Sequence, residues 1–115
     1  MRGAPLFKSA LVATNNPSHA RMDKENLLSV GCPSINIYSK GKEAFAFFRQ
    51  KPVDIILCDW FLNDMAGPQF VRALRMRKEG RNVPVIMVTS ENRRKKVLDA
   101  ISSGCTGYIL RPYSK

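Results

Sequence analysis

The chain has 115 residues, which is the length of one domain with its own hydrophobic core, and we expect residues 1–115 to form a single domain. Hydrophobic residues make up 44% of it and charged residues 24%, which is typical of folded domains and excludes a largely disordered chain. The formal net charge of +10 leaves a polyanionic partner open, whereas the lack of a long apolar run excludes a signal peptide and a membrane helix and predicts a cytoplasmic protein.

The first third of the sequence predicts a strand, a helix and a second strand. Residues 9–13 form the first short apolar strand. Asn16 and Pro17 have the pattern of an N-cap followed by a first helical residue, and Gly31 is expected to end that helix. The second strand is expected over residues 34–38.

The middle third predicts two helices around a buried strand. Residues 41–50 place alanine and phenylalanine on one helical face, which indicates that this face packs on a sheet. Residues 53–58 are almost continuously apolar, which is typical of a strand buried on both faces. Residues 67–78 are expected to form a helix because their apolar residues recur at intervals of three and four. These are Phe70, Val71, Leu74 and Met76.

The last third repeats the alternation. A buried strand is expected over residues 83–88, a helix over 91–103 with Gly104 as its C-cap, and a strand over 107–110. Alternating strands and helices predict the α/β class, with a doubly wound parallel sheet and right-handed crossovers. The chain stops soon after the last strand, so we expect no fifth helix. That face of the sheet would be bare, covered by a partner, or covered by sequence beyond this chain.

Three polar residues stand at the ends of predicted strands. In open α/β sheets, ligands bind beyond the carboxyl ends of the strands, and Asp59, Thr89 and Arg111 should all lie there. A carboxylate nucleophile, a hydroxyl donor and a guanidinium suit phosphoryl transfer. The same set also suits an ion pair that ties loops together, and the residues alone leave both interpretations open.

Three segments carry a resemblance to a known family. Residues 59–67 begin with aspartate and tryptophan and end with glycine, and residues 83–90 are an apolar strand followed by Thr89 and serine. Residues 104–113 place Tyr108 three residues before a basic residue that proline follows. In this order they resemble the receiver domain of response regulators, the chemotaxis-regulator type in particular, over nearly the whole chain. The resemblance implies a flavodoxin-like five-stranded parallel sheet with strand order 2-1-3-4-5.

The resemblance also implies a function. Asp59 would accept a phosphoryl group from a histidine kinase or a phosphotransfer protein in two-component phosphorelay signalling. Thr89 and Arg111 would bind the phosphoryl oxygens, and Tyr108 would turn inward as a switch. The face formed by the last helix and the last strand would then bind an output partner or a second copy of the chain. Such a domain is not an enzyme, beyond its own phosphorylation and dephosphorylation at Asp59.

The sequence departs from the family at the residues expected to hold Mg²⁺. The family has two acidic residues after the first strand, where this chain has Asn15 and Asn16. The resemblance would assign these two, with Asp59 and the backbone carbonyl of Phe61, as the metal ligands. At an effective dielectric near 20, each charge lost about 4 Å from the ion weakens binding by roughly 4 kcal/mol before water compensates. Asp64 is a candidate for replacing one lost carboxylate, and we expect metal-dependent phosphorylation to be weakened or lost.

A second departure is Arg111, which stands where the family has lysine. Its planar fork suggests a permanent pair with Asp59. This leaves an alternative, a pseudo-receiver that binds proteins without Mg²⁺-dependent phosphorylation. A basic nucleic-acid-binding module is less favoured, because the single basic run, residues 93–96, is more simply a solvated helix face.

Other chemistries find no support in the sequence. Cys32, Cys58 and Cys105 are far apart, which excludes a zinc ligand set and indicates reduced thiols. His19 is the only histidine, and its place early in the first helix predicts an exposed side chain. There is no Ser/His/Asp set and no glycine-rich phosphate loop.

Overall fold

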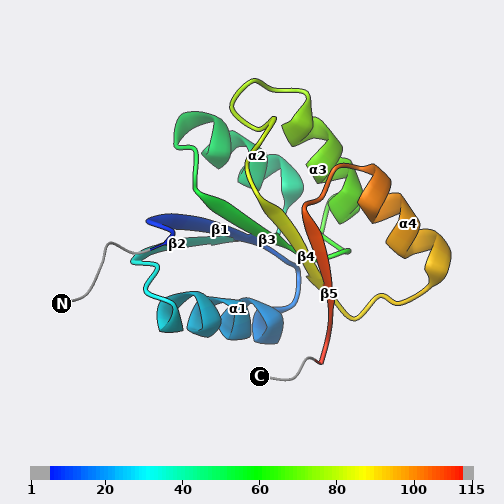
Figure 1. Ribbon diagram of the computed structural model, residues 1–115, viewed down its shortest axis with the longest axis horizontal. Helices are drawn as coiled ribbons and strands as arrows, with labels where there is room; N and C mark the ends of the chain where they lie inside the picture. The colour runs from blue at the N-terminus through cyan, green and yellow to red at the C-terminus, as the bar shows by residue number, and fades with distance from the viewer. Residues whose placement is uncertain (1–5, 113–115) are drawn as a thin grey trace.

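The protein folds around a five-stranded parallel sheet, shown in Figure 1. This computed structural model describes residues 6–112. The strand order is β2-β1-β3-β4-β5, as the resemblance implied, and every neighbouring pair is parallel. The strands are β1 (Ser9–Ala13), β2 (Ser34–Tyr38), β3 (Ile55–Cys58), β4 (Val85–Thr89) and β5 (Gly107–Leu110).

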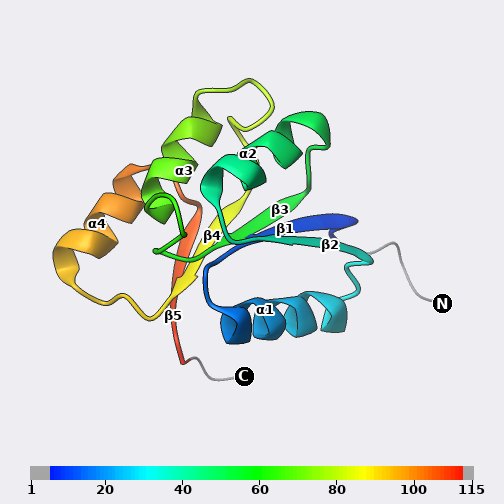
Figure 2. The same cartoon turned by 180° about the vertical axis from the view of Figure 1, so that it is seen from behind.

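Four helices cover the two faces of this sheet. The helix α1 lies on one face, and α2, α3 and α4 lie on the other (Figures 1 and 2). Their bounds are α1 (Pro17–Ser29), α2 (Gly41–Gln50), α3 (Gly67–Arg75) and α4 (Arg94–Ser102). Within residues 6–112 no helix follows β5, as expected. None of the helices in that range is long and apolar enough to cross a membrane.

Most predicted elements are confirmed, and the differences lie at element ends. β3 and β4 each begin two residues later than expected, while α3 ends at Arg75 rather than at residue 78. The Arg75 guanidinium donates to the carbonyls of Gly80 and Val83 at 2.8 and 2.6 Å, so the chain turns there instead of continuing the helix. Met76, expected on the packed face, is 83% exposed as a result.

The core consists of two clusters separated by the sheet. The larger one packs α2 and α3 on the central strands, with Phe48, Phe70 and Leu74 fully buried. The smaller one lies beneath α1 and includes Val12 and Leu27. Because the central strands are buried on both faces, only the residues at their ends can present polar groups to solvent.

Gly67 shapes the loop that follows β3. A Cβ on this residue would lie 2.2 Å from the backbone oxygen of Asp59, so no larger side chain fits. Its backbone N–H donates to the carbonyl of Trp60 at 2.7 Å. The loop therefore returns to the backbone of Asp59 and Trp60 at Gly67. This close approach explains the glycine at this position.

Candidate functional site at the carboxyl edge of the sheet

Asp59 lies at the carboxyl end of the central strand β3, as the sequence predicted. Ala13 and Cys58 are register partners on β1 and β3, and the Asp59 N–H donates to the Ala13 carbonyl at 2.8 Å. The residues that follow these two strands, Thr14 and Asp59, therefore stand side by side. Asp59 is 6% exposed, so its charge requires partners.

Three donors satisfy the Asp59 carboxylate. The Thr14 hydroxyl donates to Oδ2 at 3.1 Å, and the Trp60 backbone N–H donates to Oδ1 at 2.7 Å. The His19 ring nitrogen Nδ1 lies 2.9 Å from Oδ2. An ionised carboxylate only accepts, so Nδ1 carries the proton of this hydrogen bond.

The expectation of an exposed His19 is wrong. Its side chain is 22% exposed and turns to Asp59 from the first turn of α1. Asn16 sets this geometry, because its side-chain oxygen caps the helix by accepting from the backbone N–H groups of Ser18 and His19 at 2.9 and 3.1 Å.

Asn15 and Asn16 do not form the expected ligand pair. Thr14 and Asn15 directly follow β1, and Asn16 is the residue before α1. Asn15 is exposed, and the oxygen of Asn16 is engaged as the helix cap. Thr14, which the sequence did not assign to the metal set, is the residue after β1 that contacts Asp59.

Asp64 does not compensate for the missing carboxylates. Its two oxygens accept from the backbone N–H groups of Gly41 and Lys42 at 2.6 and 3.1 Å, at the start of α2. Desolvation raises the pKa of Asp64, but the backbone hydrogen bonds and the Lys42 charge together outweigh it, so the pKa is lowered. The residue caps α2 and points away from Asp59, so its expected role is corrected.

Arg111 pairs with Asp23 and not with Asp59. Its Nη2 lies 2.6 Å from Oδ1 of Asp23 on α1, and the two side chains are 5% and 4% exposed. Its Nε donates to the carbonyl of Val88 at 3.3 Å. Burial raises the pKa of Asp23, although the hydrogen bond from Arg111 lowers it. The expected pair of Arg111 with Asp59 is therefore not formed, because the guanidinium binds Asp23, a second buried carboxylate.

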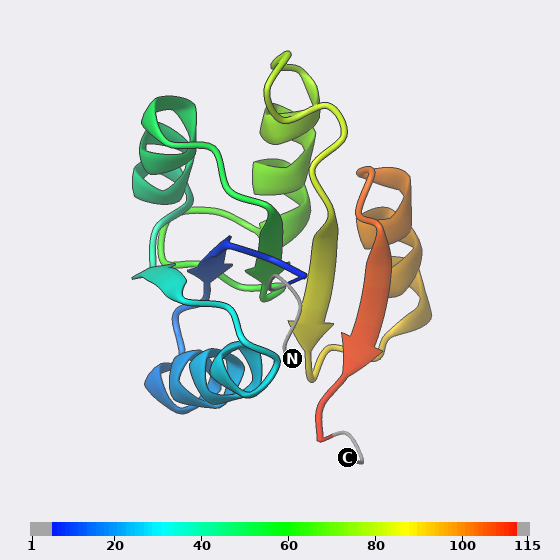
Figure 3. The ribbon, with the colours of Figure 1, turned by 60° about the vertical axis from the view of Figure 1, so that its left-hand side comes forward.

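Thr89 and Tyr108 lie on β4 and β5, which run side by side with their carboxyl ends at one edge (Figure 3). The Thr89 hydroxyl is buried and accepts from the Glu91 N–H at 3.2 Å. The Tyr108 hydroxyl donates to the Glu91 carbonyl at 2.7 Å. Both side chains therefore hold the loop between β4 and α4, and neither makes a hydrogen bond to Asp59.

Trp60, the residue after Asp59, contacts α4. Its indole N–H donates to the Lys96 carbonyl at 3.2 Å, and the Lys96 ammonium lies 4.4 Å from the ring centroid. Phe61, the next residue, is 46% exposed and pairs with Ala66 across the loop in an isolated antiparallel bridge. A change at Asp59 can thus reach α4 through one buried side chain.

The donor set at this edge does not fit a magnesium ion. Mg²⁺ in proteins takes carboxylates and water in a tight octahedron. Here one carboxylate faces the site, and both its oxygens already accept hydrogen bonds. Within residues 6–112 no cluster of three or more His, Cys, Asp or Glu could hold a metal. The neighbouring acids, Asp23 and Asp64, are committed elsewhere.

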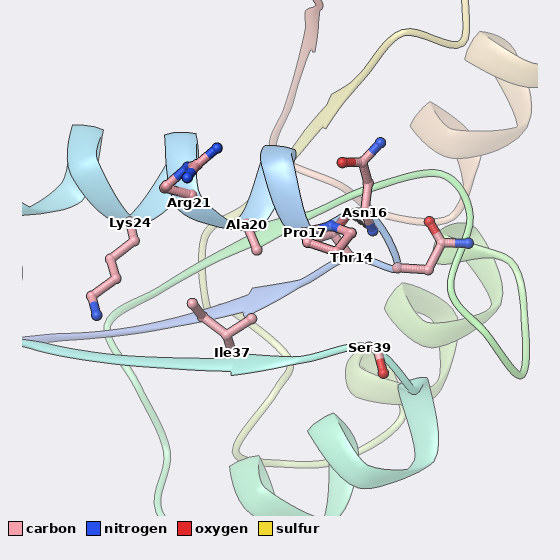
Figure 4. A pocket seen from close by; sticks show the side chains of 9 residues that line it. Thr14, Asn16, Pro17, Ala20, Arg21, Lys24, Ile37 and Ser39 are labelled. Carbon is pink, nitrogen blue, oxygen red and sulfur yellow. Dashed lines mark hydrogen bonds between the residues drawn. The ribbon is translucent and has the colours of Figure 1, made fainter.

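A groove opens beside this site between α1 and β2 (Figure 4). Its volume is about 520 Å³. Thr14 and Asn16 line one end, and Arg21 and Lys24 project from α1 along its rim. The groove thus begins at Thr14, the residue that contacts Asp59, and its positive charge lies further along α1.

The sequence and the fold match known proteins over most of their length. The family model of the response regulator receiver domain matches residues 10–115. A chemotaxis protein CheY homolog of Campylobacter jejuni is 28% identical over 105 residues, which cover 90% of this chain and 81% of that protein.

Two solved structures show the same fold. The chemotaxis response regulator CheY4 of Vibrio cholerae matches with a TM-score of 0.84 and 26% identity, covering 94% of this chain and 89% of that one. The receiver domain of a sensor histidine kinase from Pseudomonas aeruginosa, which coordinates a magnesium ion in its active-site cleft, matches with a TM-score of 0.84 and 23% identity over 93% and 87%. At this identity the second likeness concerns the fold alone.

Proposed function

Because the chain belongs to the response regulator receiver domain family of two-component signalling, we propose that Asp59 accepts a phosphoryl group from a histidine kinase or a phosphotransfer protein. Domains of this family are signalling modules rather than enzymes, and chemotaxis-type receivers act between histidine kinases and output partners. Residues 1–115 would act as one such domain in the cytoplasm.

The proposed step is an in-line displacement at phosphorus. An Asp59 oxygen forms the new P–O bond while the P–N bond of the donor phosphohistidine breaks, and the electron pair of that bond stays on the donor imidazole. Oδ2 accepts from Thr14 and His19, whereas Oδ1 accepts only from the Trp60 N–H among the described donors. Each carboxylate oxygen offers about two lone pairs, so Oδ1 is the proposed nucleophile.

One observation carries this proposal: a carboxylate that lies at the end of the central strand and whose Oδ1, within residues 6–112, accepts a single hydrogen bond, from the Trp60 N–H. The groove begins at Thr14, which contacts Asp59, and the charges of Arg21 and Lys24 along it would favour a phosphorylated donor electrostatically. Thr89 would rotate its hydroxyl from the loop to the new phosphoryl oxygens. Arg111 is assigned no contact with the phosphoryl group, because Asp23 holds it.

Output is proposed to pass through α4 and β5. Trp60 connects the site to α4, and Tyr108 connects β5 to the loop that precedes α4. The α4–β5 face carries exposed apolar side chains that a partner or a second copy could cover. These are Leu98, Ile101 and Leu110.

The test is incubation with a small phosphodonor followed by intact-mass measurement, with Asp59→Asn as the matched control. We expect one phosphoryl adduct on the unaltered chain and none on the variant. Asp54 is an exposed aspartate outside the site, so Asp54→Asn should retain the adduct. An unaltered chain that remains unmodified would contradict phosphorylation at Asp59.

A second candidate, the pseudo-receiver, is favoured by the same hydrogen bonds. The three donors on Asp59 satisfy it without a phosphoryl group, and the buried Asp23–Arg111 pair fixes α1 against β5. In that case the α4–β5 face would bind its partner equally well in the unaltered chain and in Asp59→Asn. Partner affinity that changes only when the phosphodonor is present would support the first proposal instead.

A further inference from the structure

His19 is held rigidly where it meets Asp59. It belongs to the first turn of α1, which begins at Pro17 and is capped by the Asn16 side chain. Proline presets the backbone angle of a first helical residue, and the cap fixes the turn that follows. The imidazole therefore projects from the start of a helix and not from a loop. Its Nδ1 lies 2.9 Å from Oδ2 of Asp59.

The hydrogen bonds to Oδ2 leave this oxygen no room for a cation. A carboxylate oxygen offers about two lone pairs, and on Oδ2 they meet the Thr14 hydroxyl at 3.1 Å and the His19 ring at 2.9 Å. A directly bound Mg²⁺ would have to sit about 2.0–2.1 Å from the same oxygen. The ion could bind there only after one of these two donors had left.

We propose that His19 takes the place of a divalent cation at Asp59, so that the imidazole and Mg²⁺ exclude each other at Oδ2. The imidazole N–H would orient the carboxylate and stabilise charge on Oδ2 while Oδ1 reacts. This catalytic role of the imidazole rests on the proposed function. With it, phosphorylation of Asp59 would not require Mg²⁺. The exclusion itself is a property of the resting protein and needs no phosphodonor to be measured.

The unaltered chain offers two reporters for a direct test. His19 is the only histidine and Trp60 the only tryptophan, so ¹⁵N-labelled histidine and indole fluorescence each report on a single residue beside Asp59. We expect an Nδ1–H signal from His19, and we expect neither this signal nor the Trp60 emission to change when Mg²⁺ is raised far above its cellular concentration. A saturable change in either signal would overturn the proposal.

A set of variants tests the competition quantitatively. Asn15→Asp with Asn16→Asp places two carboxylates after β1, keeps an N-cap oxygen at residue 16 and leaves the Thr14 hydroxyl on Oδ2, and His19→Ala is then added to it. We expect the triple variant to bind Mg²⁺ at least about tenfold more tightly than the double variant, measured by calorimetry. The matched control is Arg21→Ala in the same double-variant background, which removes a nearby positive charge without touching Asp59 and should change the affinity much less.

The outcomes separate the two proposals. Equal Mg²⁺ affinity of the double and triple variants would overturn the role of His19, whether or not Asp59 is phosphorylated. If circular dichroism shows that the acidic variants do not fold, the measurements on the unaltered chain decide. A chain that excludes Mg²⁺ and yet forms no phosphoryl adduct would count against the proposed function and leave the cation replacement standing.

Discussion

The backbone at Asp59 is approached closely by a residue with no side chain, Gly67. The loop after β3 returns so closely that Gly67 touches the backbone of Asp59, and a Cβ would lie 2.2 Å from the Asp59 carbonyl oxygen. A backbone atom cannot move aside as the end of a flexible side chain can. The conformation of the loop thus depends on this glycine.

Gly67→Ala is expected to lower the free energy of unfolding by about 1–3 kcal/mol, the usual cost of overpacking, because the loop must shift. Urea denaturation measures this. Gly107→Ala is the control, since its added Cβ would meet only the Cδ1 atom of Ile86, at 3.3 Å. Similar losses for the two variants would mean that the contact with Asp59 has no special cost.

The phenol of Tyr108 is another residue whose environment has a measurable effect. Burial raises its pKa to about 12, and the nearby Glu91 and Asp59 charges add to the shift. Because the folded state disfavours the phenolate, Tyr108 contributes stability that is complete below its ordinary pKa of about 10 and is lost as the pH rises toward 12.

Phenolate absorbance during an alkaline titration should therefore contain one late step that Tyr108→Phe removes. The same substitution should also flatten the fall in stability at alkaline pH. A titration curve of the variant with the late step intact would contradict this assignment.

At the scale of elements, α1 is tied to the sheet at two strands. His19 reaches Asp59 after β3, and Asp23, one turn later, reaches Arg111 after β5. The Asp23–Arg111 pair is buried, so removing one partner leaves an unpaired charge in the interior.

We expect Asp23→Ala and Arg111→Ala each to cost about 3–5 kcal/mol of unfolding free energy, and Asp23→Leu combined with Arg111→Met to cost far less. Urea denaturation of the three variants checks this. Arg72 and Asp99 form an exposed pair between α3 and α4, and Arg72→Ala should cost about 0–1 kcal/mol. If Asp23→Ala and Arg111→Ala each lowered the unfolding free energy no more than Arg72→Ala does, the buried pair would not anchor α1.

The sequence predicted the elements well because their signals are local. The apolar runs, the Asn16–Pro17 start and the helical spacing of residues 41–50 depend on neighbouring positions only. The partners of Asp59 depend on register and on helix rotation, which no local pattern encodes. The contact of the Thr14 hydroxyl with Asp59 follows from the pairing of β1 with β3.

The inward-facing position of His19 and Asp23, though not their partners, could have been recognised from the helical pattern. Ala20, Asp23 and Leu27 are the buried residues of α1, spaced by three and four, and His19 adjoins this stripe. An aspartate within an apolar stripe requires a buried partner, and Arg111 supplies it. The pairing of Arg111 with Asp23 then follows from the fold and not from any motif.

At the scale of the whole molecule, the positive charge is spread and partly engaged. In the basic run, Arg93 binds Glu91 and Lys96 stacks over Trp60, so Arg94 and Lys95 are the members without such a contact. This arrangement does not make the continuous basic stripe of a nucleic-acid interface. The expectation that residues 93–96 form a solvated helix face fits the residues of this run that are exposed.

The 19 basic residues against 9 acidic ones should nevertheless destabilise the fold by mutual repulsion. We therefore expect the midpoint of thermal unfolding to rise when the ionic strength goes from low to roughly 0.15 M, where charges beyond about 8 Å are screened. A non-ionic osmolyte at equal osmolality is the control. A midpoint that is insensitive to salt would show that local pairing already neutralises the repulsion.

The two anchors of α1 also have a consequence for how the molecule opens. A helix on one face of a sheet can unfold locally at low free energy, but α1 carries polar links to both β3 and β5. Its amides should therefore exchange with deuterium as slowly as those of the central strands. The amides of α4, where Ala100 is the one buried residue, should exchange much faster. Equal exchange rates in α1 and α4 would mean that the contacts of His19 and Asp23 open without unfolding of the sheet.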